Sequence, residues 1–283
     1  MTATAYTPHA DAASPPPDDF LSGESGEVSG IRATASALVA DALAGAYELM
    51  LLRRLRLRRA ARRWPRRRVL ALSVERADAV NVLAQARREL LRTRHQVNFR
   101  STVAGDRGKF ENLNRLLAEH RPGEHDWLIV LDDDVALPRG FLDAFIFLAE
   151  RFQLRLAQPA HQRRSHAAWR VTRRQVRNVA RETRYVEIGP VTAFQAATFD
   201  ALLPFPDLRF GWGLDAHWSA VAERENWRIG VIDATAIRHG LRVIAASYKH
   251  EDAIGEARRF LADKPYNPAS HLQRTFAVHR TWK

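Results

Sequence analysis

The sequence predicts an α/β domain in which a mostly parallel sheet carries helices on both faces. Short apolar runs alternate with amphipathic segments between residues 68 and 161, at the spacing typical of strand–helix units. The chain has 283 residues, of which 46% are hydrophobic, and this is enough to bury a sizeable core. Three aspartates directly follow one of the apolar runs, and ligands of such sheets bind beyond the carboxyl ends of the strands.

The elements of this domain follow from the change in hydrophobic period along the chain. Apolar runs predict strands, and segments with helical spacing predict helices, one of which has Pro138 in a favourable first-turn position. The expected strands cover 69–74, 96–103, 127–134, 154–161, 185–194 and 228–240, and the expected helices cover 78–93, 108–120, 138–152, 214–227 and 250–264. A loop marked by glycine and proline is expected at 205–213.

Different segments flank the α/β domain, which is expected to span 68–250. Residues 1–30 are rich in Ala, Ser, Pro, Gly and acidic residues, so a disordered tail is expected there. Residues 31–67 should form an amphipathic, arginine-rich helix that ends near Pro65. Residues 251–283 should form a C-terminal helical extension. The apolar positions of the N-terminal helix recur at helical spacing: Leu38, Ala42, Leu49, Leu52 and Leu55.

Charge is distributed unevenly in this chain, whose formal net charge is +12. Much of the excess lies in the arginine-rich segment 53–68, which indicates a solvated helix or a surface that binds an anionic membrane. Nucleic acid is the least favoured partner, because no aromatic residues interleave with these arginines in a stacking pattern.

The sequence also bears on the compartment of the protein. No run reaches the roughly 18 to 20 apolar residues of a membrane span. We expect a cytoplasmic protein, since there is no cysteine and no secretory signal pattern, with peripheral binding at the inner face of the membrane if the arginines contact lipid.

The three aspartates are the first candidate site. In an extended strand Asp132 and Asp134 share a face and Asp133 points the other way. Adjacent carboxylates repel one another, and a divalent cation such as Mg²⁺ or Mn²⁺, held with phosphate oxygens and water, relieves that repulsion. Capping of the following helix is the alternative. It explains Asp134 but gives no reason for Asp132 at the end of an apolar strand.

Two further segments carry candidate residues. In 211–215 two glycines flank Trp212 and Asp215 opens a helix, which indicates either an N-cap beside a core tryptophan or a lid loop with a general base. His239 ends the last expected strand. A histidine there is either structural or a ligand, because neutral imidazole binds Mn²⁺.

Other chemistries of aspartate pairs fit less well. Haloacid-dehalogenase-type phosphatases need Thr or Val two residues after the second aspartate, where this chain has Ala136. Sugar-nucleotide pyrophosphorylases need a glycine-rich loop after the first strand, and 72–80 contains no glycine. No P-loop, Rossmann glycine pattern or His-Glu-x-x-His zinc motif occurs.

The ordered set of "GKFENLN", "LDDD", "GWGLD" and a late strand-end histidine resembles the GT-A fold glycosyltransferases of family-2 type. Gly108, Lys109 and Asn114 match the Gly-Lys and Asn spacing of that family. The stretch from "AQPAH" to "IGVIDATAIRH" also looks like a group of uncharacterised glycosyltransferase-like proteins of bacteria and plants. The resemblance covers about 68–250 and implies a GT-A catalytic domain with a single mixed sheet flanked by helices.

The resemblance also implies roles for the candidate residues. Asp134, Asp132 and His239 would hold Mn²⁺ or Mg²⁺, and Asp215 would be the acceptor base of an inverting enzyme. Donor binding is implied for Lys109, Asn114, Asp132, Asp133, Trp212 and Gly213. Glu187 is either a second catalytic acid near the donor sugar or the partner of an arginine. Gln158 and Trp169 would shape the acceptor side.

The sequence-based hypothesis is a metal-dependent glycosyltransferase. Its donor would be a nucleotide sugar, with UDP favoured over GDP, and its acceptor a hydroxyl of an unknown glycan, lipid or small molecule. One alternative is an inactive GT-A-like scaffold with a basic tether. Another is a metal-dependent nucleotidyl or phosphoryl transferase.

Overall fold

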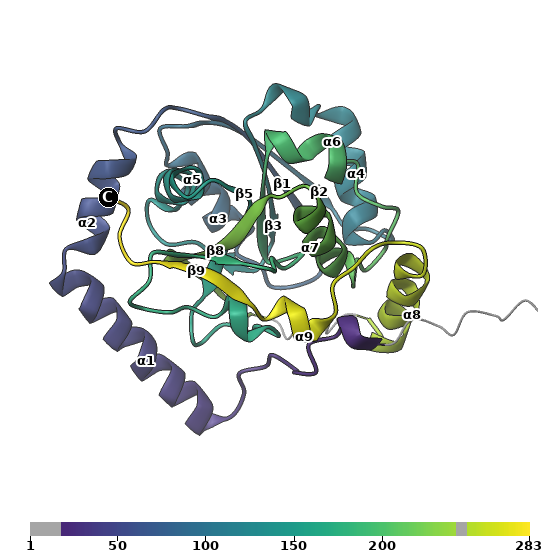
Figure 1. The fold of residues 1–283 in the computed structure, drawn as a ribbon, viewed down its shortest axis with the longest axis horizontal. Coiled ribbons are helices and arrows are strands. Elements are labelled where there is room, and N and C mark those ends of the chain that lie inside the picture. The colour runs from purple at the N-terminus through teal and green to yellow at the C-terminus, as the bar shows by residue number, and fades with distance from the viewer. Residues whose placement is uncertain (1–17, 242–247) are drawn as a thin grey trace, which may run out of the picture.

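The computed structural model of the protein describes residues 18–241 and 248–283, which form a mixed sheet flanked by helices (Figure 1). The strands hydrogen-bond in the order β2-β1-β3-β7-β5-β8-β6-β9, and β4 pairs with β8 beside this path. Their bounds are β1 Arg68–Glu75, β2 Gln96–Val103, β3 Trp127–Asp132, β4 Val135–Ala136, β5 Leu154–His161, β6 Ala180–Thr183, β7 Val191–Gln195, β8 Arg228–His239 and β9 Thr275–His279.

Helices precede, separate and follow these strands. Their bounds are α1 Ile31–Met50, α2 Arg53–Ala61, α3 Leu83–Leu91, α4 Lys109–Glu119, α5 Phe141–Arg151, α6 Phe199–Leu202, α7 Leu214–Arg224, α8 His250–Leu261 and α9 Ala269–Leu272. Single 3₁₀ turns lie at η1 Asp18–Phe20, η2 Pro122–Glu124, η3 Arg170–Thr172 and η4 Ala196–Thr198.

The register divides the sheet into a parallel part and a mixed part. β1 pairs in parallel with β2 and β3, with Val69 opposite both Val97 and Trp127. β7 is antiparallel to both β3 and β5, whereas β5 and β8 are parallel. These pairings confirm the expected α/β class and its single mixed sheet.

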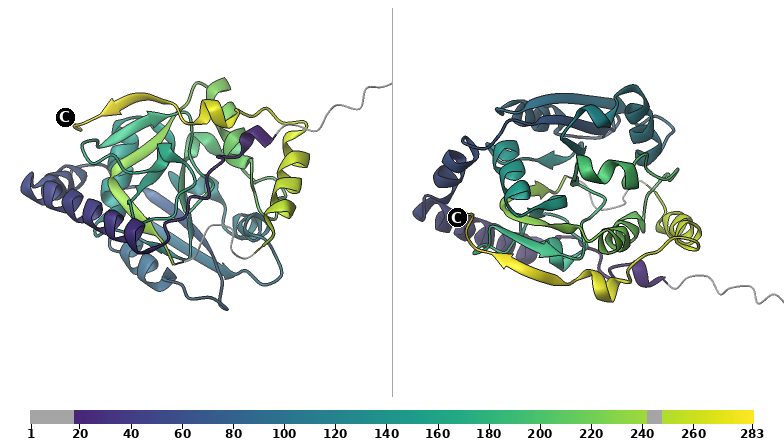
Figure 2. Two further views of the ribbon diagram at one scale, coloured as in Figure 1. Left: turned by 90° about the horizontal axis from the view of Figure 1, so that it is seen from below. Right: turned by 45° about the horizontal axis from the view of Figure 1, so that its top comes forward.

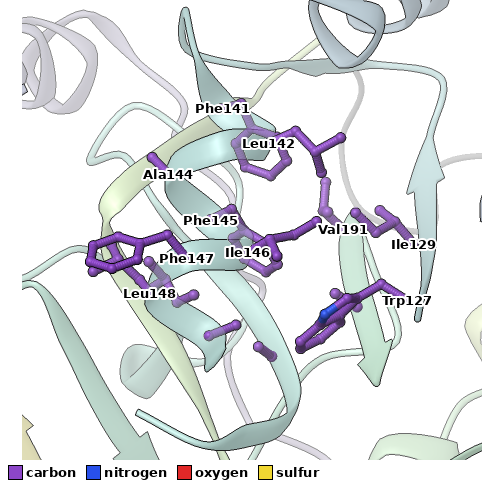
Figure 3. Packing of buried hydrophobic residues seen from close by; sticks show 14 of the residues in the cluster. Trp127, Ile129, Phe141, Leu142, Ala144, Phe145, Ile146, Phe147, Leu148 and Val191 are labelled. Atoms are coloured by element: carbon purple, nitrogen blue, oxygen red, sulfur yellow. The ribbon is translucent and has the colours of Figure 1, made fainter. Parts of the chain in front are cut away.

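Two hydrophobic clusters cover the two faces of the sheet. Helix α5 supplies one cluster, in which Phe145 and Ile146 are fully buried with Ile129 of β3 and Val191 of β7 (Figure 3). The other cluster includes side chains of α4, α6 and α7, among them Trp218, and its aromatic rings meet edge to face. This packing holds the carboxyl end of β3 rigidly between two layers.

The N-terminal segment forms two helices rather than the one expected over 31–67. The chain bends by 64° between α1 and α2, and Leu52 at the break has a positive φ of 48°. Among the described residues no single helix is long and apolar enough to cross a membrane, although α1 and α2 pass that test when counted together.

Glu150 of α5 fastens the chain that follows α2. Its carboxylate accepts hydrogen bonds from the indole N–H groups of Trp64 and Trp127 at 2.6 and 2.9 Å. It also pairs with the guanidinium of Arg67 at 2.8 Å. Burial raises the pKa of Glu150, but these hydrogen bonds outweigh it and hold the pKa below its usual value. The arginine-rich segment is thus attached to the main domain.

Several expected boundaries are wrong for local reasons. Helix α3 starts only at Leu83, because the N–H of Val82 is bonded to the carbonyl oxygen of Asp133. Helix α5 starts at Phe141, after Gly140 in the left-handed conformation, so Pro138 lies outside the helix. The strand expected over 185–194 is confined to Val191–Gln195.

Both ends of the described chain also differ from expectation. The segment 251–283 contains a strand as well as helices, because β9 pairs antiparallel with β6 and extends the sheet. Residues 18–30 are not a free tail, since Phe20 is buried against Leu272 of α9 and its neighbours. The rest of the expected tail, 1–17, lies outside the described residues.

Candidate functional site

Three potential metal ligands meet where β3 ends and β4 pairs with β8. Asp132 is the last residue of β3, Asp134 lies in the turn before β4, and the register pairs Val135 with His239. Ligand atoms of Asp132, Asp134 and His239 all lie within 4.8 Å of one another. His239 Nε2 is 3.2 Å from Asp134 Oδ1. Residues that are distant in the sequence are therefore brought together by strand pairing.

The surroundings of this trio leave one side accessible. The side chain of Asp134 is 3% exposed and that of His239 is 13% exposed, whereas that of Asp132 is 30% exposed. Burial lowers the pKa of His239, but the hydrogen bond and charge of Asp134 outweigh it and raise the pKa overall. The trio is thus anchored on its inner side and open at Asp132.

Lys109 reaches the trio from the start of α4. Its Nζ is 2.7 Å from Asp132 Oδ1 and donates to the carbonyl oxygen of Ile188 at 3.0 Å. Gly189 leaves room for this contact, because a Cβ there would lie 2.9 Å from both Asp132 Oδ2 and Lys109 Nζ. The structure therefore joins Lys109 to the metal-ligand candidates.

Asp133 and Asn114, both expected at the donor site, form hydrogen bonds with backbone groups of nearby segments. Asp133 lies in the turn after β3 and is not part of the trio, and its Oδ2 accepts the N–H of Arg76 at 2.8 Å. Asn114 bonds through its amide to both the N–H and the carbonyl oxygen of Phe205, at 3.0 and 2.8 Å. In the described structure both side chains are engaged in holding loops.

Asp215 lies in the first turn of α7 and has a buried carboxylate. It accepts a short hydrogen bond from the hydroxyl of Tyr185 and one of 3.0 Å from the N–H of Ala216. Burial raises the pKa of Asp215 to about 6, against the effect of these hydrogen bonds, and the charge of Glu187 adds to the rise. Such a pKa suits a group that exchanges protons near neutral pH.

Glu187 is the centre of a second polar cluster. Its Oε2 is 2.7 Å from His161 Nε2, its Oε1 accepts the hydroxyl of Thr172 at 3.1 Å, and its N–H donates to Gln158 Oε1 at 2.5 Å. His161 Nδ1 and Gln158 Nε2 are buried without a partner in the part of the chain that the structure describes. The hydrogen-bonding partners of the Glu187 carboxylate are thus a histidine and a threonine, rather than the arginine considered from the sequence.

Aromatic contacts connect the surroundings of Glu187 with His239 and with Trp169. His161 of β5 lies near His239, with ring centroids 6.5 Å apart. Trp169, expected on the acceptor side, is buried against Tyr185 with ring centroids 4.4 Å apart. The sequence does not indicate the contacts that the candidate acids make with His161, Thr172 and Tyr185. These residues come from separate strands and loops, and no local motif joins them.

The loop before α7 is held by Glu256 of α8. This carboxylate accepts the N–H groups of Arg209, Phe210 and Gly211 at 2.7, 2.9 and 2.9 Å. Trp212 Nε1 donates to the hydroxyl of Tyr248 at 2.9 Å. The segment expected to be a lid is therefore fastened to the C-terminal helix in this conformation.

Gly211 and Gly213 fit this loop closely. Both have positive φ, of 82° and 80°. A Cβ at Gly211 would meet the ring of Phe110 at 2.0 Å, and one at Gly213 would lie 2.9 Å from Leu261. A side chain at either position is incompatible with the packing that places Asp215 at the head of α7.

Two hollows of the described surface lie away from the trio. One cavity of about 460 Å³ and another of about 30 Å³ lie on other parts of the described surface, and neither has Asp132, Asp134 or His239 among its lining residues. The feature that distinguishes the candidate site is the close spacing of its carboxylate and imidazole ligand atoms.

Comparisons with known proteins identify the fold. No family model and no curated protein matches the sequence. S. aureus TarS (residues 1–349) in complex with UDP-GlcNAc is similar at a TM-score of 0.52 and 12% identity, over 72% of this chain and 69% of that chain. The mannosyltransferase PcManGT from Pyrobaculum calidifontis, in complex with GDP-Man and Mn²⁺, matches at 0.47 and 15% identity, over 85% and 79%.

A third similar structure is GalNAc-T7 with UDP, GalNAc and Mn²⁺, at a TM-score of 0.47 and 10% identity, over 73% of this chain and 54% of that chain. Together with the strand order, the similarity to TarS shows that this chain has the GT-A glycosyltransferase fold. The finer resemblance to a group of bacterial and plant proteins stays a prediction, because no sequence comparison matches.

Proposed function

We propose that this protein is a metal-dependent glycosyltransferase that moves a sugar from a nucleoside-diphosphate donor to a hydroxyl acceptor. The observation that carries the proposal is the trio of Asp132, Asp134 and His239 at the carboxyl end of β3, with the ligand atoms within 4.8 Å of one another. Nucleotide ligands of open α/β sheets bind at this edge, so the trio lies where a donor diphosphate is expected.

The trio fits a divalent cation by its chemistry. Two carboxylates and one imidazole suit Mn²⁺, while Mg²⁺ prefers oxygen ligands alone. Asp134 and His239 would hold the ion from the buried side and Asp132 from the exposed side. When bound, the cation would stabilise the negative charge that develops on a departing nucleoside diphosphate.

The donor would lie along β3 and the start of α4. Lys109 is near enough to Asp132 to exchange its present ion pair for a phosphate oxygen. The loop before α7 reaches the start of α4 at Arg209, whose carbonyl oxygen accepts the N–H of Lys109 at 3.2 Å, and Trp212 and Gly213 of this loop are proposed to contact the donor. We propose a UDP-sugar as the first donor to test and a GDP-sugar as the second, because TarS, the similar structure with a TM-score above 0.5, is a complex with UDP-GlcNAc.

Asp215 is the proposed acceptor base of an inverting reaction. Its carboxylate would take the proton of the acceptor hydroxyl as the sugar is transferred, and its pKa of about 6 leaves it ionised at neutral pH. Tyr185 orients the carboxylate by its hydrogen bond. Glu187 supports the site through His161 and stands as the second candidate acid.

Product analysis tests the proposal. The protein is incubated with UDP-sugars or GDP-sugars and Mn²⁺, with and without a pool of hydroxyl acceptors, and the released nucleotide is identified. A glycosyltransferase releases nucleoside diphosphate, by slow donor hydrolysis where no acceptor fits, and Asp134→Asn abolishes the release.

The alternatives give different products. A nucleotidyl or phosphoryl transferase would release pyrophosphate or inorganic phosphate instead. An inactive GT-A-like scaffold would release nothing from any donor, even where metal and nucleotide bind. Either result contradicts the proposed transferase activity.

A further inference from the structure

Helix α1 is attached to the main domain through its charged side. Asp41 accepts the N–H groups of Arg163 and Arg164 at 2.9 and 3.0 Å. Glu48 is buried and binds the guanidinium groups of Arg174 and Arg54. Both acidic residues of this helix are therefore engaged in hydrogen bonds or ion pairs within the protein.

The outward side of the same helix is apolar. On a helix at the surface of a globular protein, the apolar side normally faces the core and the charged side faces water. Here the arrangement is reversed, since large apolar side chains between 43% and 75% exposed cover the outer side: Leu38, Val39, Leu43, Leu49 and Met50. A continuous apolar surface of this kind indicates a binding face.

Helix α2 adds positive charge beside this apolar face. The chain bends by 64° between the two helices, which lie at one edge of the molecule (Figures 1 and 2). Leu52 and Leu55 continue the exposed apolar surface across the bend at 55% and 45% exposure. Exposed arginines surround them and extend past the end of α2: Arg54, Arg56, Arg59, Arg62, Arg63 and Arg66.

We propose that α1 and α2 dock on a membrane that carries anionic lipids, with the apolar face of α1 inserted at the interface and the arginines of α2 on the headgroups. An apolar face flanked by arginines is complementary to such a surface, because acyl chains take up the first and lipid phosphates pair with the second. A second copy of the chain is a poorer partner, since two chains of net charge +12 would bring their arginines together.

The contacts of Asp41 and Glu48 fix how the helix binds. They hold one side of α1 on the protein, so the helix lies in the plane of the interface instead of crossing it. The arrangement does not depend on the proposed transferase activity, because these helices contribute no residue of the metal-ligand trio.

Site-specific fluorescence tests the docking directly, because the chain has no cysteine of its own. A polarity-sensitive dye is attached to the full chain at Leu43→Cys and, as a control at an exposed position of the edge strand β2, at Val103→Cys. Vesicles of phosphatidylcholine with phosphatidylglycerol should shift the emission of the dye at 43 to the blue and leave the dye at 103 unchanged. Vesicles of phosphatidylcholine alone should bind weakly, and added salt should release the protein.

Vesicle flotation of unlabelled variants supplies the second arm. Leu43→Asp and Met50→Asp should each weaken binding to anionic vesicles by about tenfold or more, since each replaces an apolar side chain that inserts at the interface. Arg59→Glu should act in the same direction, whereas Arg100→Glu and Val103→Asp on β2 should not. All five positions are exposed, so unchanged melting temperatures would verify folding.

Three results would overturn the proposal. The first is no binding to anionic vesicles at low salt, and the second is binding that Leu43→Asp leaves unchanged. The third is a concentration-dependent dimer in light scattering that Leu43→Asp dissociates, which would assign the face to a second copy of the chain.

Discussion

His239 Nε2 lies 3.2 Å from Asp134 Oδ1, and the pairing of β4 with β8 holds the two residues together. The register places His239 directly opposite Val135, which follows Asp134 in the chain. Because β8 is a long, mostly buried strand of the central sheet, this contact is fixed by the fold rather than by a loop. A site with this support is organised before any ligand binds.

The buried carboxyl group of Asp215 should make stability depend on pH. Its pKa is about 6 in the folded chain against 3.8 when unfolded, so the folded chain binds the proton more tightly. Protonation of Asp215 therefore stabilises the folded chain. This stabilisation is fully present below about pH 4 and is lost as pH rises through about 6, so the free energy of unfolding falls by about 3 kcal/mol. Urea unfolding across this pH range should show a fall in the free energy of unfolding for the wild type, and no such fall for Asp215→Asn. Parallel curves for the two proteins would contradict the assignment.

Two neighbours of Asp215 should change its pKa in opposite directions. The hydroxyl of Tyr185 donates to the carboxylate and lowers its pKa, whereas the negative charge of Glu187 raises it. Tyr185→Phe should therefore raise the pKa of Asp215, and Glu187→Gln should lower it. Carbon NMR of labelled aspartate measures both shifts. If Asp215 is the acceptor base, the acid limb of the activity profile should move with them, and shifts of the same sign in both variants would refute the arrangement.

Gly211 should tolerate no side chain. In Gly211→Ala the new Cβ would meet Phe110 at 2.0 Å, on a backbone with a φ of 82°. The resulting overpacking and strain should cost about 2 kcal/mol or more. Gly45→Ala in α1 is the matched control, because nothing lies within 4 Å of its Cβ and alanine favours a helix by about 1 kcal/mol. Chemical unfolding of both variants measures the contrast, and equal effects would contradict it.

The buried ion pair of Arg181 and Asp233 should be essential for stability. Both side chains are fully buried, and two hydrogen bonds of 2.8 and 3.0 Å join them. Asp233→Asn should destabilise the fold by about 3 to 5 kcal/mol, because the guanidinium charge then has no counterion. The exposed pair of Arg184 and Glu223 provides the comparison, and Glu223→Gln should cost less than about 1 kcal/mol. Similar losses in the two variants would show that burial does not decide the effect.

The elements of the α/β domain could be predicted from the sequence because the hydrophobic period changes between strands and helices. The strand that ends at Asp132 could be predicted from its apolar run, whereas the period of a strand does not place Asp133 and Asp134, which form the turn between β3 and β4. The contact with His239 could not be derived in this way, since it depends on how β4 and β8 pair.

The polar cluster around Glu187 could not be predicted from the sequence for a related reason. Its partners come from β5 and from the 3₁₀ turn η3, which only the tertiary fold brings together. The orientation of α1 was missed as well. Its apolar positions, including Leu38 and Leu49, indicate an amphipathic helix, but periodicity does not reveal whether the apolar side faces the core or the solvent.

Calorimetric titration of UDP and GDP into the protein, with and without Mn²⁺, tests the central claim most directly. The account predicts that one nucleotide binds only in the presence of Mn²⁺. Asp134→Asn and His239→Ala should abolish this binding, whereas Asp200→Asn, an exposed aspartate on α6, should retain it. Binding that is independent of Mn²⁺ or unchanged in Asp134→Asn, or no binding of either nucleotide, would contradict the assignment of Asp132, Asp134 and His239 as a metal site for a nucleotide donor.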